Sequence, residues 1–161
     1  MKNETKQIIN LNLEALQEQF EGLQKQIDKA VEVLRGELKF RCNINKKEMQ
    51  NIMNDMKGEV APPLEMGLLE FEKFSNISNK YLFENEYFKI LTHLSFTLKS
   101  YQKSIKFFDH ISQNVDVLSN ASLCRNFVTM VYFQKLLDKN TKFLQALKGA
   151  LIQQEASEIC M

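Results

Sequence analysis

The chain has 161 residues, a formal net charge of +1 and 44% hydrophobic residues, a composition typical of a globular protein large enough to fold alone. The nearly neutral charge excludes a strong overall attraction to nucleic acid or to an anionic membrane, although a local basic patch is compatible with it. With two prolines and five scattered glycines, the composition favours an all-helical fold over one with many strands.

The three cysteines, Cys42, Cys124 and Cys160, are odd in number and far apart in the sequence. They include no CxxC pair, which argues against a disulfide framework and against a zinc site. The sequence also shows no basic start followed by an apolar leader, and no apolar run long enough to cross a bilayer. We therefore expect a cytoplasmic protein.

The first predicted helix covers about residues 4–40 and carries an unbroken apolar stripe. The spacing of the stripe alternates between four and three residues, which is the period of helices that pack as in a coiled coil. Its members are Ile9, Leu13, Leu16, Phe20, Leu23, Ile27, Ala30 and Leu34. The flanking positions, which include Gln17 and Gln24, carry neutral side chains. This is typical of one wall of a helical bundle, because a free-standing zipper usually has charged flanks.

A short helix is predicted at about 45–57, and one of its faces is rich in methionine. The residues of this face are Met49, Ile52, Met53 and Met56. Methionine-rich faces bind varied apolar partners, but they also fill ordinary cores, so this face is either a partner-binding surface or a part of the core. Two consecutive prolines then mark a connector at about 58–63, which we place inside a single domain covering residues 1–161.

Helices are next predicted at about 63–80 and 84–113. The second of these carries another stripe with the same alternating spacing, formed by Tyr87, Leu91, Leu94, Leu98, Tyr101, Ile105 and Phe108. Pairing the two stripes within one chain gives a bundle that needs no outside partner. A last long helix is predicted at about 115–155, with a joint near 138–141, and residues 157–161 are expected to fray.

The usual sequence signatures of catalysis and of cofactor binding are missing. The isolated glycines form neither a P-loop nor a dinucleotide-binding fingerprint. His93 and His110 lack the spacing of metal ligands, and neither has a glutamate three residues before it. Cys124 would meet a histidine only through the fold, and no local motif supports such a nucleophile pair. We therefore predict no cofactor, no metal site and no enzymatic activity.

Lysines are the only charged residues between Tyr87 and Phe108, and three of them share one helical face. These three are Lys99, Lys103 and Lys106, spaced at i, i+4 and i+7. Such a stripe can contact phosphates, which keeps nucleic-acid binding open. Lysine is also the ordinary residue of a solvated helix surface, and that interpretation is the simpler one.

Together these patterns predict an all-α, single-domain antiparallel bundle of four to five helices with coiled-coil-like seams. We expect a non-catalytic protein-binding function, as an adaptor, a scaffold or a protein that resembles a chaperone or co-chaperone and presents an apolar groove to a helical partner, or self-association. The candidate contact residues are Met49, Ile52, Met53, Met56, Gln17 and Gln24. The alternative is a small nucleic-acid-binding subunit that uses Lys99, Lys103 and Lys106, and no membrane association is expected.

Overall fold

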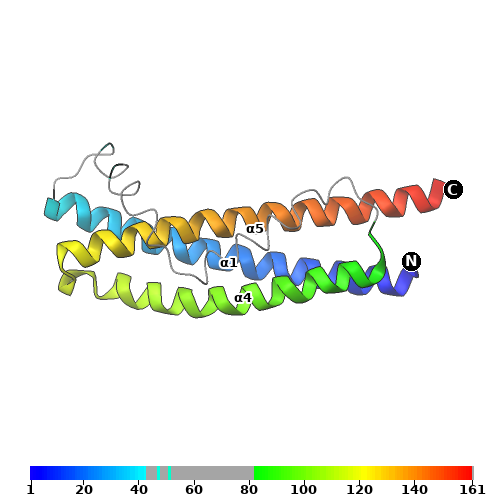
Figure 1. Cartoon of the computed structure of the whole chain (residues 1–161), viewed down its shortest axis with the longest axis horizontal. Helices are drawn as coiled ribbons and strands as arrows, with labels where there is room; N and C mark the ends of the chain where they lie inside the picture. Colours follow the sequence, from blue (N-terminus) through cyan, green and yellow to red (C-terminus); the bar gives the residue numbers. More distant parts are fainter. Residues whose placement is uncertain (43–46, 48–50, 52–81, 161) are drawn as a thin grey trace.

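A computed structural model describes residues 1–42, 47, 51 and 82–160 of the chain. This part contains three long helices and one short 3₁₀ turn. They are α1 (Asn3–Cys42), α4 (Glu84–Gln113), η3 (Val115–Val117) and α5 (Asn120–Cys160). The long helices lie side by side in an elongated bundle (Figure 1).

The all-helical class and the two helices predicted at 4–40 and 84–113 are confirmed. The predicted total of four to five helices is not confirmed, because three long helices pack together in the described part of the chain. The helix predicted at 63–80 lies outside the described residues, and so does the one predicted at 45–57 except for residues 47 and 51.

The directions of the described helices differ from those of a simple antiparallel bundle. Figure 1 shows α1 and α4 running in the same direction, with α5 antiparallel to both. The chain leaves α1 at one end of the bundle and begins α4 at the opposite end, which makes this pair parallel. The antiparallel prediction therefore holds for α5 relative to each of the other two helices, and not for α1 relative to α4.

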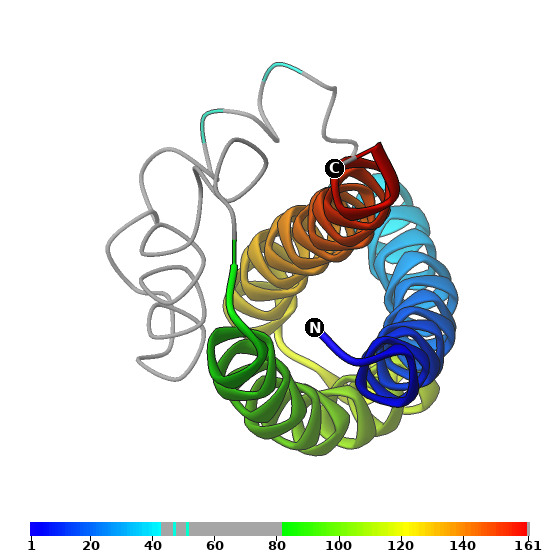
Figure 2. The same cartoon turned by 90° about the vertical axis from the view of Figure 1, so that its right-hand side faces the viewer.

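The core lies along the shared axis of the three helices, which form a ring when viewed end-on (Figure 2). Every residue of the two predicted stripes is buried. A third stripe, on α5, completes the core with the same three-and-four spacing. It consists of Met130, Phe133, Leu137, Asn140, Leu144, Leu147, Leu151 and Gln154. Burial of a large apolar side chain contributes about 1.5–3 kcal/mol, so these stripes supply most of the stability of the bundle.

Helix α1 is the common neighbour of the other two. The backbones of α4 and α5 both pack closely against α1 and approach each other less closely. Aromatic side chains fill the space between them. The ring of Tyr101 makes edge contacts with Phe20 on α1 and Phe133 on α5, at centroid distances of 6.3 and 5.0 Å, and Phe108 lies 5.3 Å from Phe133. Edge-to-face packing of this kind adds to the burial of the rings.

The turn between α4 and α5 is held by Arg41, near the C-terminal end of α1. Its guanidinium donates to the backbone carbonyls of Val115, Asp116 and Leu118, and Nε pairs with Glu37 at 2.6 Å.

The last helix starts at Asn120 and not at 115, because Ser119 caps it. Its hydroxyl accepts a hydrogen bond from the Ser122 amide at 3.1 Å, and Leu118 before it is extended. Helix α5 then continues through 138–141 without the predicted joint, and it extends to Cys160, into the stretch where fraying was expected.

A pair of phenylalanine substitutions tests this core. We expect Phe133→Ala to lower the free energy of unfolding by about 3–5 kcal/mol, because a ring that three helices surround leaves a cavity. Phe96→Ala, which removes a ring that is 65% exposed, should change it by less than about 0.5 kcal/mol. Urea unfolding followed by circular dichroism measures both, and equal effects of the two substitutions would contradict the assigned core.

Candidate functional site

An open groove of about 430 Å³ runs between α1 and α4 on the outside of the bundle. Its buried lining residues, Leu16, Leu91 and Leu98, belong to the two stripes and form an apolar floor. Apart from the half-buried ring of Phe88, the side chains above this floor are small or polar. The small and polar ones are Asn12, Ala15 and Gln19 on α1, and Thr92, Ser95, Lys99 and Gln102 on α4. The α1–α4 groove is therefore a concave surface with an apolar floor and a polar rim, the usual form of a binding site.

The register between the two parallel helices explains why the groove is open. Gln102 donates to Gln19 at 3.5 Å, so α4 position 102 lies beside α1 position 19. One heptad toward the N-terminal ends of both helices, Asn12 and Ser95 take the corresponding flanking positions. Ala15 lies between Asn12 and Gln19 on α1, so that short or polar side chains stand over leucines that keep 5–6% of their surface exposed. A larger residue at Ala15 or Ser95 would close the groove.

Two large apolar side chains, one turn along the helices from groove residues, are exposed. Leu11 lies one turn before Ala15 on α1, and Phe96 lies one turn after Thr92 on α4. Each has 65% of its surface in contact with solvent. Exposed apolar residues around a concave apolar floor mark a surface that a partner could cover.

The three lysines predicted to share a face are all exposed on the outer side of α4. We call Lys99, Lys103 and Lys106 the lysine face. Lys99 also lines the groove, so the lysine face begins at the rim and continues away from it along α4. No residue of the described part of the chain forms an ion pair with any of the three, and none of the acidic residues of α4 lies between Tyr87 and Phe108.

The other predicted contact residues do not join this groove. The methionine face, Met49, Ile52, Met53 and Met56, lies outside the described residues. Gln17 and Gln24 are half-buried on the opposite flank of α1, toward α5, where each donates to an acidic residue one turn later. Asp28, the acceptor for Gln24, also accepts from Gln134 of α5 at 2.6 Å. The two glutamines therefore belong to the α1–α5 boundary.

The sequence pattern did not identify Asn12, Ser95 and Gln102 as groove residues. The apolar pattern of a single helix does not show which flank of that helix stays open in the bundle. The available signal was weak. It consisted of small or amide side chains at matching flanking positions of two stripes, next to the exposed apolar residues Leu11 and Phe96.

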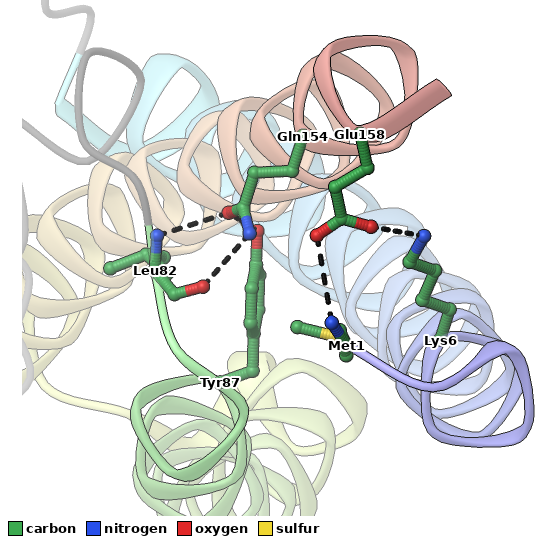
Figure 3. Close-up of polar contacts among 6 residues, drawn as sticks. All are labelled: Met1, Lys6, Leu82, Tyr87, Gln154 and Glu158. Carbon is green, nitrogen blue, oxygen red and sulfur yellow. Dashed lines mark hydrogen bonds and ion pairs between the residues drawn. The ribbon is translucent and has the colours of Figure 1, made fainter. Parts of the chain in front are cut away.

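At the end of the bundle where α4 begins, the Gln154 side chain binds the incoming chain (Figure 3). Its amide nitrogen donates to the carbonyl of Leu82 at 2.8 Å, and its oxygen accepts from the Leu82 amide at 3.1 Å. The same oxygen accepts from the Tyr87 hydroxyl at 2.6 Å. All three residues are buried. Each polar group in this cluster thus has a partner, as burial requires.

Beside this cluster, Glu158 of α5 connects to the beginning of α1 (Figure 3). Its carboxylate lies 2.5 Å from the Lys6 ammonium and 3.7 Å from the Met1 amine.

A hollow at this end of the bundle is bordered by Leu82, Phe83, Glu84 and other residues, and its volume of about 570 Å³ exceeds that of the groove. It adjoins residue 81, which the structure does not describe, so the α1–α4 groove is the better-defined candidate.

A buried polar pair lies at the centre of the bundle. Asn140 of α5 donates to the Tyr101 hydroxyl at 3.2 Å and to the Leu136 carbonyl at 2.8 Å. Burial raises the pKa of Tyr101 to about 12, and the hydrogen bond from Asn140 opposes this effect only in part. The phenol therefore stays neutral and serves as a structural group at ordinary pH.

Of the residues considered for catalysis, Cys124 and His93 are not brought together. Cys124 lies in the second turn of α5, whereas His93 is twenty residues before the end of α4 that faces this turn. At 1.5 Å per residue, the two are roughly 20 Å apart along the bundle, which excludes a direct nucleophile pair. His110 is exposed and contacts Asn114 at 3.4 Å. Among the described residues no group of three or more histidines, cysteines or carboxylates could hold a metal ion.

Comparisons with known proteins add no further constraint. No protein-family model matches the chain, and neither a curated protein nor a solved structure does. Within the described residues, the helices are too polar for any of them to span a membrane.

The pKa of Tyr101 predicts a pH-dependent stability. Because the folded value of about 12 lies above the unfolded value of about 10, the unfolded chain loses this proton first as pH rises. The contribution of Tyr101 to the free energy of unfolding is therefore complete below pH 10. It is lost between pH 10 and 12, and the total loss is roughly 2–3 kcal/mol. We expect Tyr101→Phe to remove this component. Urea unfolding at pH 8, 10 and 11 tests it, and parallel pH profiles for the two proteins would contradict it.

A second substitution pair tests the cluster at Leu82. We expect Gln154→Ala to lower the free energy of unfolding by about 2–4 kcal/mol, because the buried Leu82 backbone and the Tyr87 hydroxyl lose a common partner. The neighbouring Gln153 is exposed, so Gln153→Ala should have almost no effect. Amide hydrogen exchange at Leu82 should become faster in the Gln154 variant alone. Unchanged exchange at Leu82 would show that the cluster does not hold this segment.

Proposed function

We propose that this protein is a non-catalytic protein-binding module, an adaptor, scaffold or co-chaperone, that holds an amphipathic helix of a partner in the α1–α4 groove. The open groove itself is the observation that carries the proposal. Its leucine floor and polar rim match the requirements of helix-in-groove recognition, in which apolar side chains at i, i+3, i+4 and i+7 enter a concave surface.

The position of the groove supports this function. Its floor is built from Leu16, Leu91 and Leu98, which also belong to the core, so the floor is held in place by the packing of two long helices. A site on a rigid scaffold keeps its shape before binding, and this reduces the entropy that association costs.

Nucleic-acid binding is a second candidate because the lysine face is exposed and has no acidic partner among the described residues. Its three ammonium groups recur at one-turn intervals on one side of α4, where they can follow a phosphate backbone. The protein-binding proposal accounts for more of the surface, since phosphate contacts would leave the leucine floor unused.

Two alanine substitutions test the proposed function. Ala15 lines the groove and Ala156 lies on α5 near its end, and both are exposed helical positions. We expect the side chain introduced by Ala15→Trp to fill the groove. The tagged full chain should then retain helical partner proteins at least about tenfold less, which is the effect of losing one well-placed contact. Ala156→Trp should leave it unchanged. Circular dichroism verifies that both variants fold.

The opposite result is equally informative. If both tryptophan variants retain the same proteins in the same amounts as the unmodified chain, the groove does not bind them. If no protein is retained, and a single-stranded oligonucleotide binds in a salt-dependent way that Lys99→Glu abolishes, the nucleic-acid candidate replaces the proposed function.

A further inference from the structure

We infer that the α1–α4 groove selects an acidic amphipathic helix, one with an apolar stripe for the floor and carboxylates on the side that faces α4. This inference rests on the proposed function and deepens it, because it specifies the charge of the partner and the orientation of its charged side. It follows from how the charges are distributed around the groove.

The two sides of the groove differ in charge. The α1 side contributes Asn12, Ala15 and Gln19, which are uncharged, and α4 contributes Lys99, the only charged residue among the described residues that line the groove. Beyond Lys99, the lysine face continues with Lys103 and Lys106 along the same helix. A helix lying in the groove would therefore meet neutral α1 side chains on one side and the Lys99 ammonium on the other. A helix that continues past Gln102 along α4 would also reach Lys103 and Lys106.

The spacing of the lysine face fits a helical partner. Its first and last residues are seven steps apart on α4, about 10 Å along the helix axis, so the ammonium groups recur about once per turn. Carboxylates at i, i+4 and i+7 of an aligned partner helix recur with the same period. Charge pairs of this kind beside an apolar seam set the choice and orientation of partners in coiled coils.

The lysines are available for such pairs. None of Lys99, Lys103 and Lys106 has an ion-pair partner among the described residues. By contrast, Lys142 on α5 pairs with Asp138 at 2.9 Å, and Lys148 lies 3.9 Å from Glu14. Binding of an acidic helix at the lysine face therefore breaks no ion pair within the described structure.

A second copy of this chain is disfavoured in one of its possible arrangements. Two copies joined through this groove with their α4 helices facing each other would bring their lysine faces together, and juxtaposed like charges oppose association. The nucleic-acid and membrane alternatives use the lysines but not the concave floor, since neither a phosphate backbone nor a flat lipid surface inserts apolar side chains between Leu16 and Leu91. An acidic helix uses both features.

The test begins with a display library of helical peptides screened against the full chain. Each peptide has about 18 residues, enough for five turns, with leucine fixed at i, i+4, i+7 and i+11. The remaining positions vary among Glu, Gln, Lys and Ala. We expect the selected peptides to be rich in Glu along one flank of the leucine stripe. Selection of neutral or basic flanks would overturn the inference.

The chain provides a matched control for the charge effect. Lys135, Lys139 and Lys142 are exposed on α5 with the same i, i+4 and i+7 spacing as the lysine face. We expect the triple change Lys99→Glu, Lys103→Glu and Lys106→Glu to weaken binding of the selected Glu-rich peptide at least about tenfold. The corresponding triple change on α5 alters the net charge equally and should have less than about a twofold effect, since its charges are screened at that distance. Equal losses in the two triples would overturn the inference.

The outcomes separate this inference from the proposed function. If Ala15→Trp abolishes peptide binding but the lysine substitutions do not affect it, the groove binds helices without regard to charge, and only the inference fails. If the selected peptides bind independently of Ala15→Trp, both fail. If a duplex oligonucleotide or a vesicle of phosphatidylserine and phosphatidylcholine binds the lysine face more tightly than the peptide, the partner class is wrong.

Discussion

The apolar stripe of α1 packs against α4 on one side and against α5 on the other, and the rest of the bundle depends on this shared contact. The backbones of α4 and α5 lie farther from each other than from α1. Large rings bridge the space between them, above all Tyr101 and Phe133. A central helix with two neighbours leaves two outer boundaries, and the groove lies along the boundary between α1 and α4.

Three polar contacts set how the helices align along their length. Apolar stripes that repeat every seven residues look alike after a shift of one repeat, so burial alone does not select one alignment. Arg41 fixes the turn after α4 at one end, Gln154 holds Leu82 at the other, and Asn140 bonds Tyr101 at the centre. A shift by one repeat would leave these buried groups without partners, which costs more than the apolar contacts would regain.

The sequence predicted the elements of this fold better than their arrangement. The stripes of α1 and α4 are unbroken, so their burial and the bounds of both helices were predictable from periodicity alone. The stripe on α5 was harder to see, because Asn140 and Gln154 interrupt it with polar residues whose partners are distant in the sequence. The start of α5 was not predicted correctly, because the helical pattern of the sequence begins before residue 119. The Ser119 cap, and not that pattern, sets the first residue of the helix.

The directions of the helices and the position of the groove could not be predicted either, and here the physical reason is different. A heptad pattern is the same whether a neighbour runs parallel or antiparallel, so the parallel arrangement of α1 and α4 left no signal in either stripe. The groove depends on that arrangement, because it places Asn12 and Ser95 together. The lysine face was visible in the sequence, but its position beside an apolar floor was not.

The groove and the lysine face together give the bundle a surface that discriminates between partners. The leucine floor accepts many apolar stripes, which gives affinity without strong selectivity. The charged side of α4 next to a neutral side of α1 supplies the selectivity, because it favours one charge pattern and one orientation.

The most direct test of this account is amide chemical-shift mapping of the full chain during titration with the selected Glu-rich peptide. We predict that the largest shifts occur at Ala15, Gln19, Ser95 and Lys99, with little change at Gln134 and Gly149 on α5. Shifts centred on α5, or spread evenly over the three helices, would contradict the assignment of the α1–α4 groove as the binding site.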